Sequence, residues 1–197
     1  MTIGIESTAR REERIRLELD QIAENMRLLR DAAATIAAAS EIMTRSLRSG
    51  GKIMFCGNGG SAADAQRLAA ELMGRYLKDR APLPALALTV DTSALTAIAN
   101  DYSYDEVFAR QLRGIGRRGD VLLGLSTSGN SSNVVRAIEA ARDLGTGSLA
   151  LTGQHGGRIA EIADHVIRVP ATRTNSIQEM HIVIGHMLCG FIEEALC

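Results

Sequence analysis

The sequence has no tryptophan, and aromatic residues make up only 3% of its 197 residues. Single-stranded nucleic acids are held largely by bases stacking on aromatic side chains, and few such side chains are available here. The formal net charge is −1, and basic residues are spread along the chain rather than gathered in one block. Because no basic patch is indicated, we expect neither a nucleic acid nor a membrane as a partner.

Long apolar runs are missing as well. No segment approaches the roughly 20 apolar residues that a membrane-spanning helix needs. The first residues, MTIGIESTARREERIR, are charged where a secretory signal would need an apolar stretch. The sequence therefore predicts a cytoplasmic protein.

Cysteine and proline are scarce, with three of each against 19 glycines. Cys56, Cys189 and Cys197 are an odd, widely spaced set without a metal-type pair, so neither a disulfide framework nor a cysteine zinc site is indicated. The glycines favour tight turns over linkers. A chain of this length is expected to form a single domain over 1–197.

A helical segment is predicted over about 1–50, ahead of an α/β core over about 51–197. From Glu12 to Arg48 there is no glycine or proline, and apolar residues recur at three- and four-residue spacing, which is typical of helix. These apolar residues exceed what one helix face needs. We expect some of them to pack against another subunit, the alternative being that they cover the sheet of their own chain.

After the helical segment, short apolar runs alternate with helix-like stretches. The runs lie at 52–57, 84–90, 120–126, 147–153 and 165–171, and the helical stretches near 61–78, 104–117, 132–144, 156–164 and 176–195. The alternation predicts a three-layer α/β/α sandwich with a five-stranded parallel sheet. Ligands of such sheets gather beyond the carboxyl ends of the strands, so the loops after the first and third strands are the main candidates for a site.

The loop after the first strand, CGNGGSAADA, is rich in glycine. Gly57, Gly59 and Gly60 allow a tight turn that a polar ligand could approach closely. Ser61 and Asp64 have the spacing of a capping box at the start of the next helix. By itself the loop is a weak signal, because such turns occur in many phosphate binders and also as plain turns.

The loop after the third strand, LSTSGNSSN, carries four hydroxyl groups around one glycine, just before a helix. Ser126, Thr127, Ser128 and Ser131 together with helix N–H groups could hold a phosphate without a lysine. The alternative is a serine-rich capping loop. The Gly-Lys-Ser/Thr ending of a nucleotide-binding P-loop is missing, which disfavours nucleoside triphosphate hydrolysis.

Together, the two loops resemble those of the sugar isomerase domain family, which 57–61 and 126–131 match. Agreement continues through AELMGRY at 70–76, AIANDYSYDEVF at 97–108, ALTGQHGG at 150–157 and IQEMHIVIGH at 177–186, in the order found in phosphoheptose isomerases. The resemblance implies conversion of sedoheptulose 7-phosphate into D-glycero-D-manno-heptose 7-phosphate through an enediol, the first step towards nucleotide-activated heptoses for lipopolysaccharide or other products. It also implies a homotetramer.

The resemblance assigns roles to individual residues. Glu71 corresponds to the general base and His186 to the acid/base histidine; without the resemblance, a solvated helix charge and a core histidine would be the simpler interpretations. His181 lies on another helix face and is the weaker candidate. The residues that the resemblance places on the sugar are Asn58, Gly59, Gly60, Ser61, Arg75, Asn100, Asp101 and Gln178, and those on the phosphate are Ser126, Thr127, Ser128 and Ser131.

One position departs from the family pattern. Many members carry a zinc-ligating histidine one turn before the catalytic glutamate, and this chain has Arg67 there. A guanidinium cannot replace a neutral imidazole as a metal ligand. Zinc on Glu71, Gln178 and His186 is therefore possible but doubtful, and no cofactor is expected to be required.

Two other functions are compatible with the same motifs. One is a non-catalytic sugar isomerase domain that acts as a binding or regulatory module, and the other is an isomerase of a different ketose phosphate. The presence of both Glu71 and His186 favours an enzyme. A sugar-phosphate sensor that binds DNA is disfavoured because no helix-turn-helix segment is added to the domain.

Overall fold

The computed structural model describes residues 7–197, and its centre is a five-stranded, all-parallel sheet with the strand order β2-β1-β3-β4-β5. The strands are β1 (Ile53–Gly57), β2 (Ala85–Ala87), β3 (Val121–Ser126), β4 (Gly147–Thr152) and β5 (His165–Arg168). In the register of the sheet Gly57 pairs with Leu125, and Ser126 pairs with Thr152. The ends of β1, β3 and β4 therefore lie side by side at one edge.

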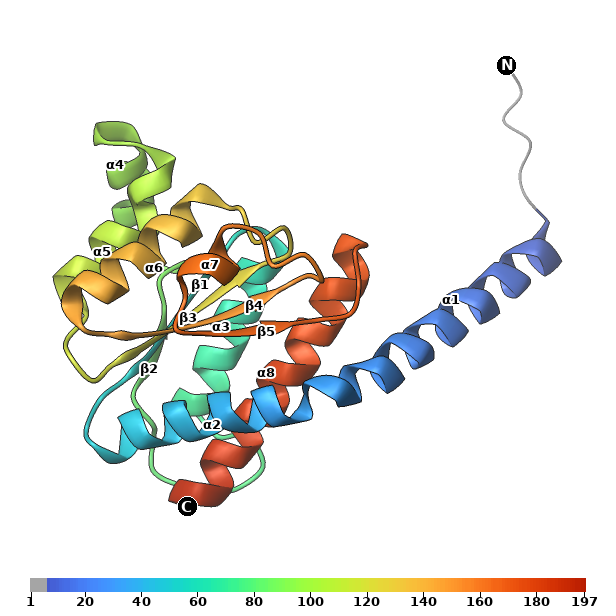
Figure 1. Cartoon of the computed structure of the whole chain (residues 1–197), viewed down its shortest axis with the longest axis horizontal. Coiled ribbons are helices and arrows are strands. Elements are labelled where there is room, and N and C mark those ends of the chain that lie inside the picture. Colours follow the sequence, from blue (N-terminus) through green and yellow to red (C-terminus); the bar gives the residue numbers. More distant parts are fainter. Residues whose placement is uncertain (1–6) are drawn as a thin grey trace.

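Helices cover both faces of the sheet (Figure 1). They are α1 (Thr8–Leu28), α2 (Ala33–Arg48), α3 (Gly60–Met73), α4 (Thr92–Asp101), α5 (Val107–Ile115), α6 (Ser132–Leu144), α7 (Ile159–Ile162) and α8 (Thr174–Leu196), with short 3₁₀ turns η1 (Leu29–Ala32) and η2 (Tyr104–Glu106). Residues of α2, α3 and α8 share one buried cluster, and residues of α5, α6 and α7 share the other. The predicted α/β/α sandwich with N-terminal helices is confirmed.

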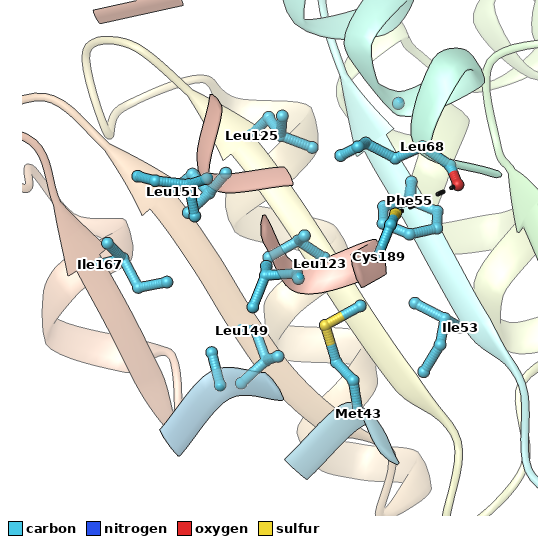
Figure 2. Packing of buried hydrophobic residues seen from close by; sticks show 14 of the residues in the cluster. Met43, Ile53, Phe55, Leu68, Leu123, Leu125, Leu149, Leu151, Ile167 and Cys189 are labelled. Carbon is cyan, nitrogen blue, oxygen red and sulfur yellow. Dashed lines mark hydrogen bonds between the residues drawn. The ribbon is translucent and has the colours of Figure 1, made fainter. Parts of the chain in front are cut away.

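The two clusters follow the alternation of side chains along the strands. Phe55 and Leu123 point into the cluster with α2, α3 and α8, whereas the neighbouring Met54 and Leu122 point into the other. Figure 2 shows the first cluster, in which Met43 of α2 and Cys189 of α8 lie among strand residues such as Phe55 and Leu123. Because β1 and β3 are buried on both faces, their sequences are almost continuously apolar.

Helix α1 extends away from the rest of the chain (Figure 1). Asn25 is its one buried residue. Ile15, Leu17 and Leu19 are more than half exposed, at 59%, 59% and 58%. Across the described part of the chain, no helix is long and apolar enough to cross a membrane.

Several element boundaries differ from the prediction. The capping box at Ser61 and Asp64 is wrong: α3 begins after Gly59, whose φ of +56° favours glycine, and no side chain caps it. The helix ends at Met73 rather than near residue 78. Helix α4 was not predicted; none of its residues is buried, and its apolar residues Leu95, Ile98 and Ala99 pack partly buried against the second cluster. The division of the chain into one domain with a helical segment and a core stays a prediction.

Candidate active site

The two loops singled out in the sequence meet where the strand order reverses. Strand β1 lies between β2 and β3, so the chain leaves β1 towards one side of the sheet and continues from β3 towards the other. Such a switch point leaves a crevice outside the carboxyl ends of the strands. The pairing of Gly57 with Leu125 places Asn58 and Ser126, the next residues, beside each other at the carboxyl edge of the sheet.

The hydroxyl-rich loop after β3 is ordered by its own side chains. The hydroxyls of Ser126 and Ser131 lie 2.9 Å apart, and the Asn130 N–H donates to Ser128 Oγ over 3.1 Å. Ser131 is the N-cap residue of α6, yet its side chain makes no capping bond to that helix. The hydroxyl is therefore turned into the loop, where the first turn of α6 also presents N–H groups.

The segment after β4 supports the hydroxyl-rich loop from behind. The Gly153 N–H donates to Thr127 O over 3.1 Å, and the Ile159 N–H donates to Gly129 O over 2.9 Å. Gly129 has a φ of +67° and packs so closely on Gly156 that no side chain fits there. The glycines of ALTGQHGG thus permit a close approach of two backbones, whose hydrogen bonds hold the loop in place.

Asn58 connects the two loops. Its amide exchanges a pair of 2.8 Å hydrogen bonds with the amide of Asn133 on α6, and its Oδ1 also accepts from the Tyr104 hydroxyl over 3.1 Å. These bonds use most of the amide's capacity. The structure therefore places Asn58 as the link between loops, which leaves little of its side chain for a sugar.

Helices α3 and α8 run in parallel and carry the predicted acid/base pair. At the start of both, Gly60 lies so close to Gln178 that a Cβ would be 2.6 Å from the Gln178 amide nitrogen. Further along, Gly185 packs on Leu68 in the same way. This register brings Glu71 level with Cys189, whose thiol pKa is raised to about 12 by burial and further by the charge of Glu71.

The surroundings of His186 combine an aromatic ring with charges. Its imidazole stacks on Tyr76, with ring centroids 5.7 Å apart and an angle of 21° between the planes. Burial raises the pKa of Asp64, and attraction to Arg67 and His186 opposes this shift. Asp64, Arg67 and His186 therefore share one electrostatic environment beside Glu71.

His181 is a different kind of histidine. Its side chain is fully buried, and within the part of the chain that the structure describes neither ring nitrogen has a hydrogen-bond partner. Burial lowers its pKa to about 4, although the nearby Thr152 backbone acts in the opposite direction. It is neutral near pH 7 and fully buried, whereas His186 is half-buried.

Of the remaining predicted contacts, Ser61 is buried in α3, whereas Arg75, Asn100 and Asp101 are exposed. Arg75 follows the end of α3. Asn100 and Asp101 end α4, where the Asn100 amide donates to Asp101 Oδ1 over 2.8 Å. Tyr104, three residues on, hydrogen-bonds Asn58 and so brings this end of α4 to the crevice.

The donor set does not fit a zinc site. Among residues 7–197, no three His, Cys, Asp or Glu side chains gather in a way that could hold a metal ion. Besides Glu71 and His186, the predicted ligand set contains only the amide of Gln178, which is a weak ligand for zinc. Arg67, one turn before Glu71, adds a fixed positive charge at the same place.

The match to known proteins agrees with this arrangement. The family model of the SIS domain matches residues 19–153. The phosphoheptose isomerase of Rhodospirillum rubrum is 59% identical over 94% of this chain and 99% of its own length. That of Akkermansia muciniphila is 55% identical over 93% and 97%. The chain belongs to the phosphoheptose isomerases of the SIS domain family.

A solved phosphoheptose isomerase has the same fold. The structure from Neisseria gonorrhoeae superimposes with a TM-score of 0.88 at 45% identity, covering 93% of this chain and 98% of that one. The resemblance to the phosphoheptose isomerases and the expectation of an isomerase are therefore confirmed. The relatives therefore favour an enzyme over the alternative of a non-catalytic binding module.

Some residues of the site escaped the sequence reasoning. Asn133 and Tyr104 fix Asn58, and Tyr76 stacks on His186. Tyr76 and Tyr104 lie inside the segments that carry the family resemblance, AELMGRY and AIANDYSYDEVF, which was the one signal available for them. Nothing in the sequence alone pairs Asn133 with Asn58.

Proposed function

We propose that this phosphoheptose isomerase converts sedoheptulose 7-phosphate into D-glycero-D-manno-heptose 7-phosphate, the first step towards nucleotide-activated heptoses. The proposal is supported by three observations together: membership of the phosphoheptose isomerases, the hydroxyl-lined loop after β3, and the packing of α3, which carries Glu71, against α8, which carries His186. The loop suits a terminal phosphate, and the helix pair suits proton transfer at the other end of an open sugar chain.

The reaction moves a carbonyl from C2 to C1 without net gain or loss of atoms. Glu71 takes the proton from C1 and His186 gives a proton to the carbonyl oxygen at C2, which yields the enediol. Glu71 then returns its proton to C2, while His186 takes the proton from the C1 hydroxyl as the aldehyde forms. Both side chains end in their starting protonation states, so the cycle can repeat.

The experiment for the proposal is an NMR assay of purified protein with sedoheptulose 7-phosphate. Appearance of the aldose signals is the expected result. Fructose 6-phosphate and unphosphorylated sedoheptulose are the matched comparisons, for sugar length and for the phosphate. Turnover of fructose 6-phosphate at the higher rate would assign the enzyme to another ketose phosphate.

The phosphate loop yields a prediction about affinity. Replacing Ser131 with alanine is expected to raise KM for the phosphorylated sugar roughly ten- to hundredfold, because a hydrogen bond to a charged group contributes about 1.5–3 kcal/mol. The rate at saturation should change far less. Ser128→Ala tests the same loop, and Ser132→Ala, at an exposed neighbouring position, is the control. Unchanged affinity in both Ser131→Ala and Ser128→Ala would remove the loop from the phosphate site.

We further propose that the activity needs no zinc, since the donor set around Arg67 does not fit one. Protein as purified is expected to contain little tightly held zinc and to keep its activity after dialysis against a chelator. The Arg67→His variant supplies the imidazole missing from the set and should gain zinc affinity. Stoichiometric zinc in the native protein, or activity lost on chelation and restored by zinc, would contradict the proposal.

For the assembly, we propose a homotetramer in which α1 contributes to the contacts between subunits. The extension of α1 from the body and the exposure of Ile15, Leu17 and Leu19 support this proposal (Figure 1). Apolar side chains exposed together are typical of an interface. Light scattering should give the mass of four chains, and the mass of one chain would overturn the proposal.

A further inference from the structure

A buried ion pair joins the loop after α3 to the last turns of α8. Arg80 Nε lies 3.0 Å from Glu193 Oε1, and the two side chains are only 4% and 2% exposed. Burying two charges is costly, and a well-packed apolar pair is often as stable. The presence of this buried pair therefore needs an explanation other than stability.

Arg80 holds the carboxyl end of α3. Its Nη2 donates to Glu71 O over 2.8 Å, and its Nη1 donates to Leu72 O over 2.8 Å and to Gly74 O over 3.1 Å. The last carbonyls of a helix have no N–H partner within the helix. A buried guanidinium thus fixes the turn of α3 that carries Glu71.

Glu193 holds the chain just beyond α3. Its carboxylate accepts the backbone N–H groups of Tyr76, Leu77 and Lys78 over 3.1, 2.8 and 2.9 Å. Burial alone would raise the pKa of Glu193, but these N–H groups and Arg80 outweigh burial and lower it, so the carboxylate is charged. With its backbone held in this way, Tyr76 stacks on His186.

We propose that the Arg80–Glu193 pair positions Glu71 and His186 relative to each other. A continuous series of contacts leads from the Glu71 backbone through Arg80 and Glu193 to the Tyr76 backbone, and from the Tyr76 ring to His186. His186 and Glu193 lie two turns apart on α8, so this helix also connects Glu193 to His186 directly. Arg80 and Glu193 are positioning residues and do not touch the substrate; the inference rests on the proposed roles of Glu71 and His186.

Kinetics of variants at both positions test this role. The double variant Arg80→Met/Glu193→Leu leaves no unpaired charge buried, and Glu193→Gln keeps the shape of the side chain. We expect both to lower kcat roughly ten- to hundredfold with KM within about threefold of wild type, because small displacements of reacting groups are that costly. Should neither fold by circular dichroism, Arg80→Lys decides, since it keeps the charge but cannot reach three carbonyls at once.

The control is Glu139→Gln, which breaks an exposed ion pair with Arg136 and should leave kcat unchanged. A purely structural pair would give folded variants with the wild-type kcat and a lower melting temperature. That result would overturn the proposal.

A spectroscopic readout is independent of the substrate assay. The His186 ring signals, assigned by their loss in His186→Gln, carry the ring-current shift of Tyr76. We expect Glu193→Gln to move them towards their positions in Tyr76→Leu, whereas Tyr76→Phe should leave them in place. Unmoved signals in Glu193→Gln would overturn the inference even if sedoheptulose 7-phosphate is turned over. A wild type inactive on that sugar would instead overturn the proposed function.

Discussion

Replacing Glu71 with glutamine is expected to lower kcat roughly 10²–10⁴-fold, or about 3–5 kcal/mol of transition-state stabilisation. The amide has the shape of the carboxyl group but cannot accept the proton from C1. Because the proposed phosphate site is elsewhere, in the loop after β3, binding should change little. Rates with sedoheptulose 7-phosphate, together with the affinity for it, provide the measurement.

Deuterium exchange at C1 distinguishes a role of Glu71 as the base from other contributions to the rate. In D₂O the wild-type enzyme should exchange the C1 proton of its substrate for deuterium, and Glu71→Gln should not. Glu139→Gln, on the surface of α6, is the matched control and should keep both turnover and exchange. If Glu71→Gln retained a tenth of the wild-type rate, another group would have to be the base.

Elements with a strong local signal were predictable from the sequence. Helix α6 occupies the predicted 132–144, and Gly145, at a φ of +67°, ends it in the left-handed conformation; Ser131 stands at its N-cap position but makes no side-chain capping bond. Strand β3 was predicted within one residue, since a central parallel strand is apolar throughout. The edge strand β2 is shorter than the predicted 84–90, because it pairs with one neighbour only.

Contacts between residues that are distant in the sequence could not be predicted from local patterns. The two loops of the site could be predicted because each follows a strand whose end lies at a known edge of a parallel sheet. The structure at the end of α3 could not be predicted, because Arg80, whose guanidinium fixes it, pairs with Glu193, 113 residues away. The same holds for Asn58, whose partner Asn133 is 75 residues distant. Composition and periodicity say nothing about which of many polar residues will meet.

Substituting His186 by glutamine is expected to lower kcat roughly 10²-fold or more while KM for the phosphorylated sugar stays within about threefold. Glutamine can still donate a hydrogen bond towards the sugar oxygens, but it cannot pass a proton between the oxygens on C2 and C1. The loss should therefore fall on the chemical step. Single-turnover rates with wild type and variant measure it directly.

The other histidines of the chain supply the controls for this substitution. His155 is exposed and corresponds to no catalytic position, so His155→Gln should keep the wild-type rate. His181→Gln alters a fully buried side chain and is expected to lower the melting temperature, with a smaller effect on the rate of the folded enzyme. If His186→Gln kept the wild-type rate, or if His155→Gln were equally slow, proton transfer between the oxygens would have to be assigned to a group other than His186.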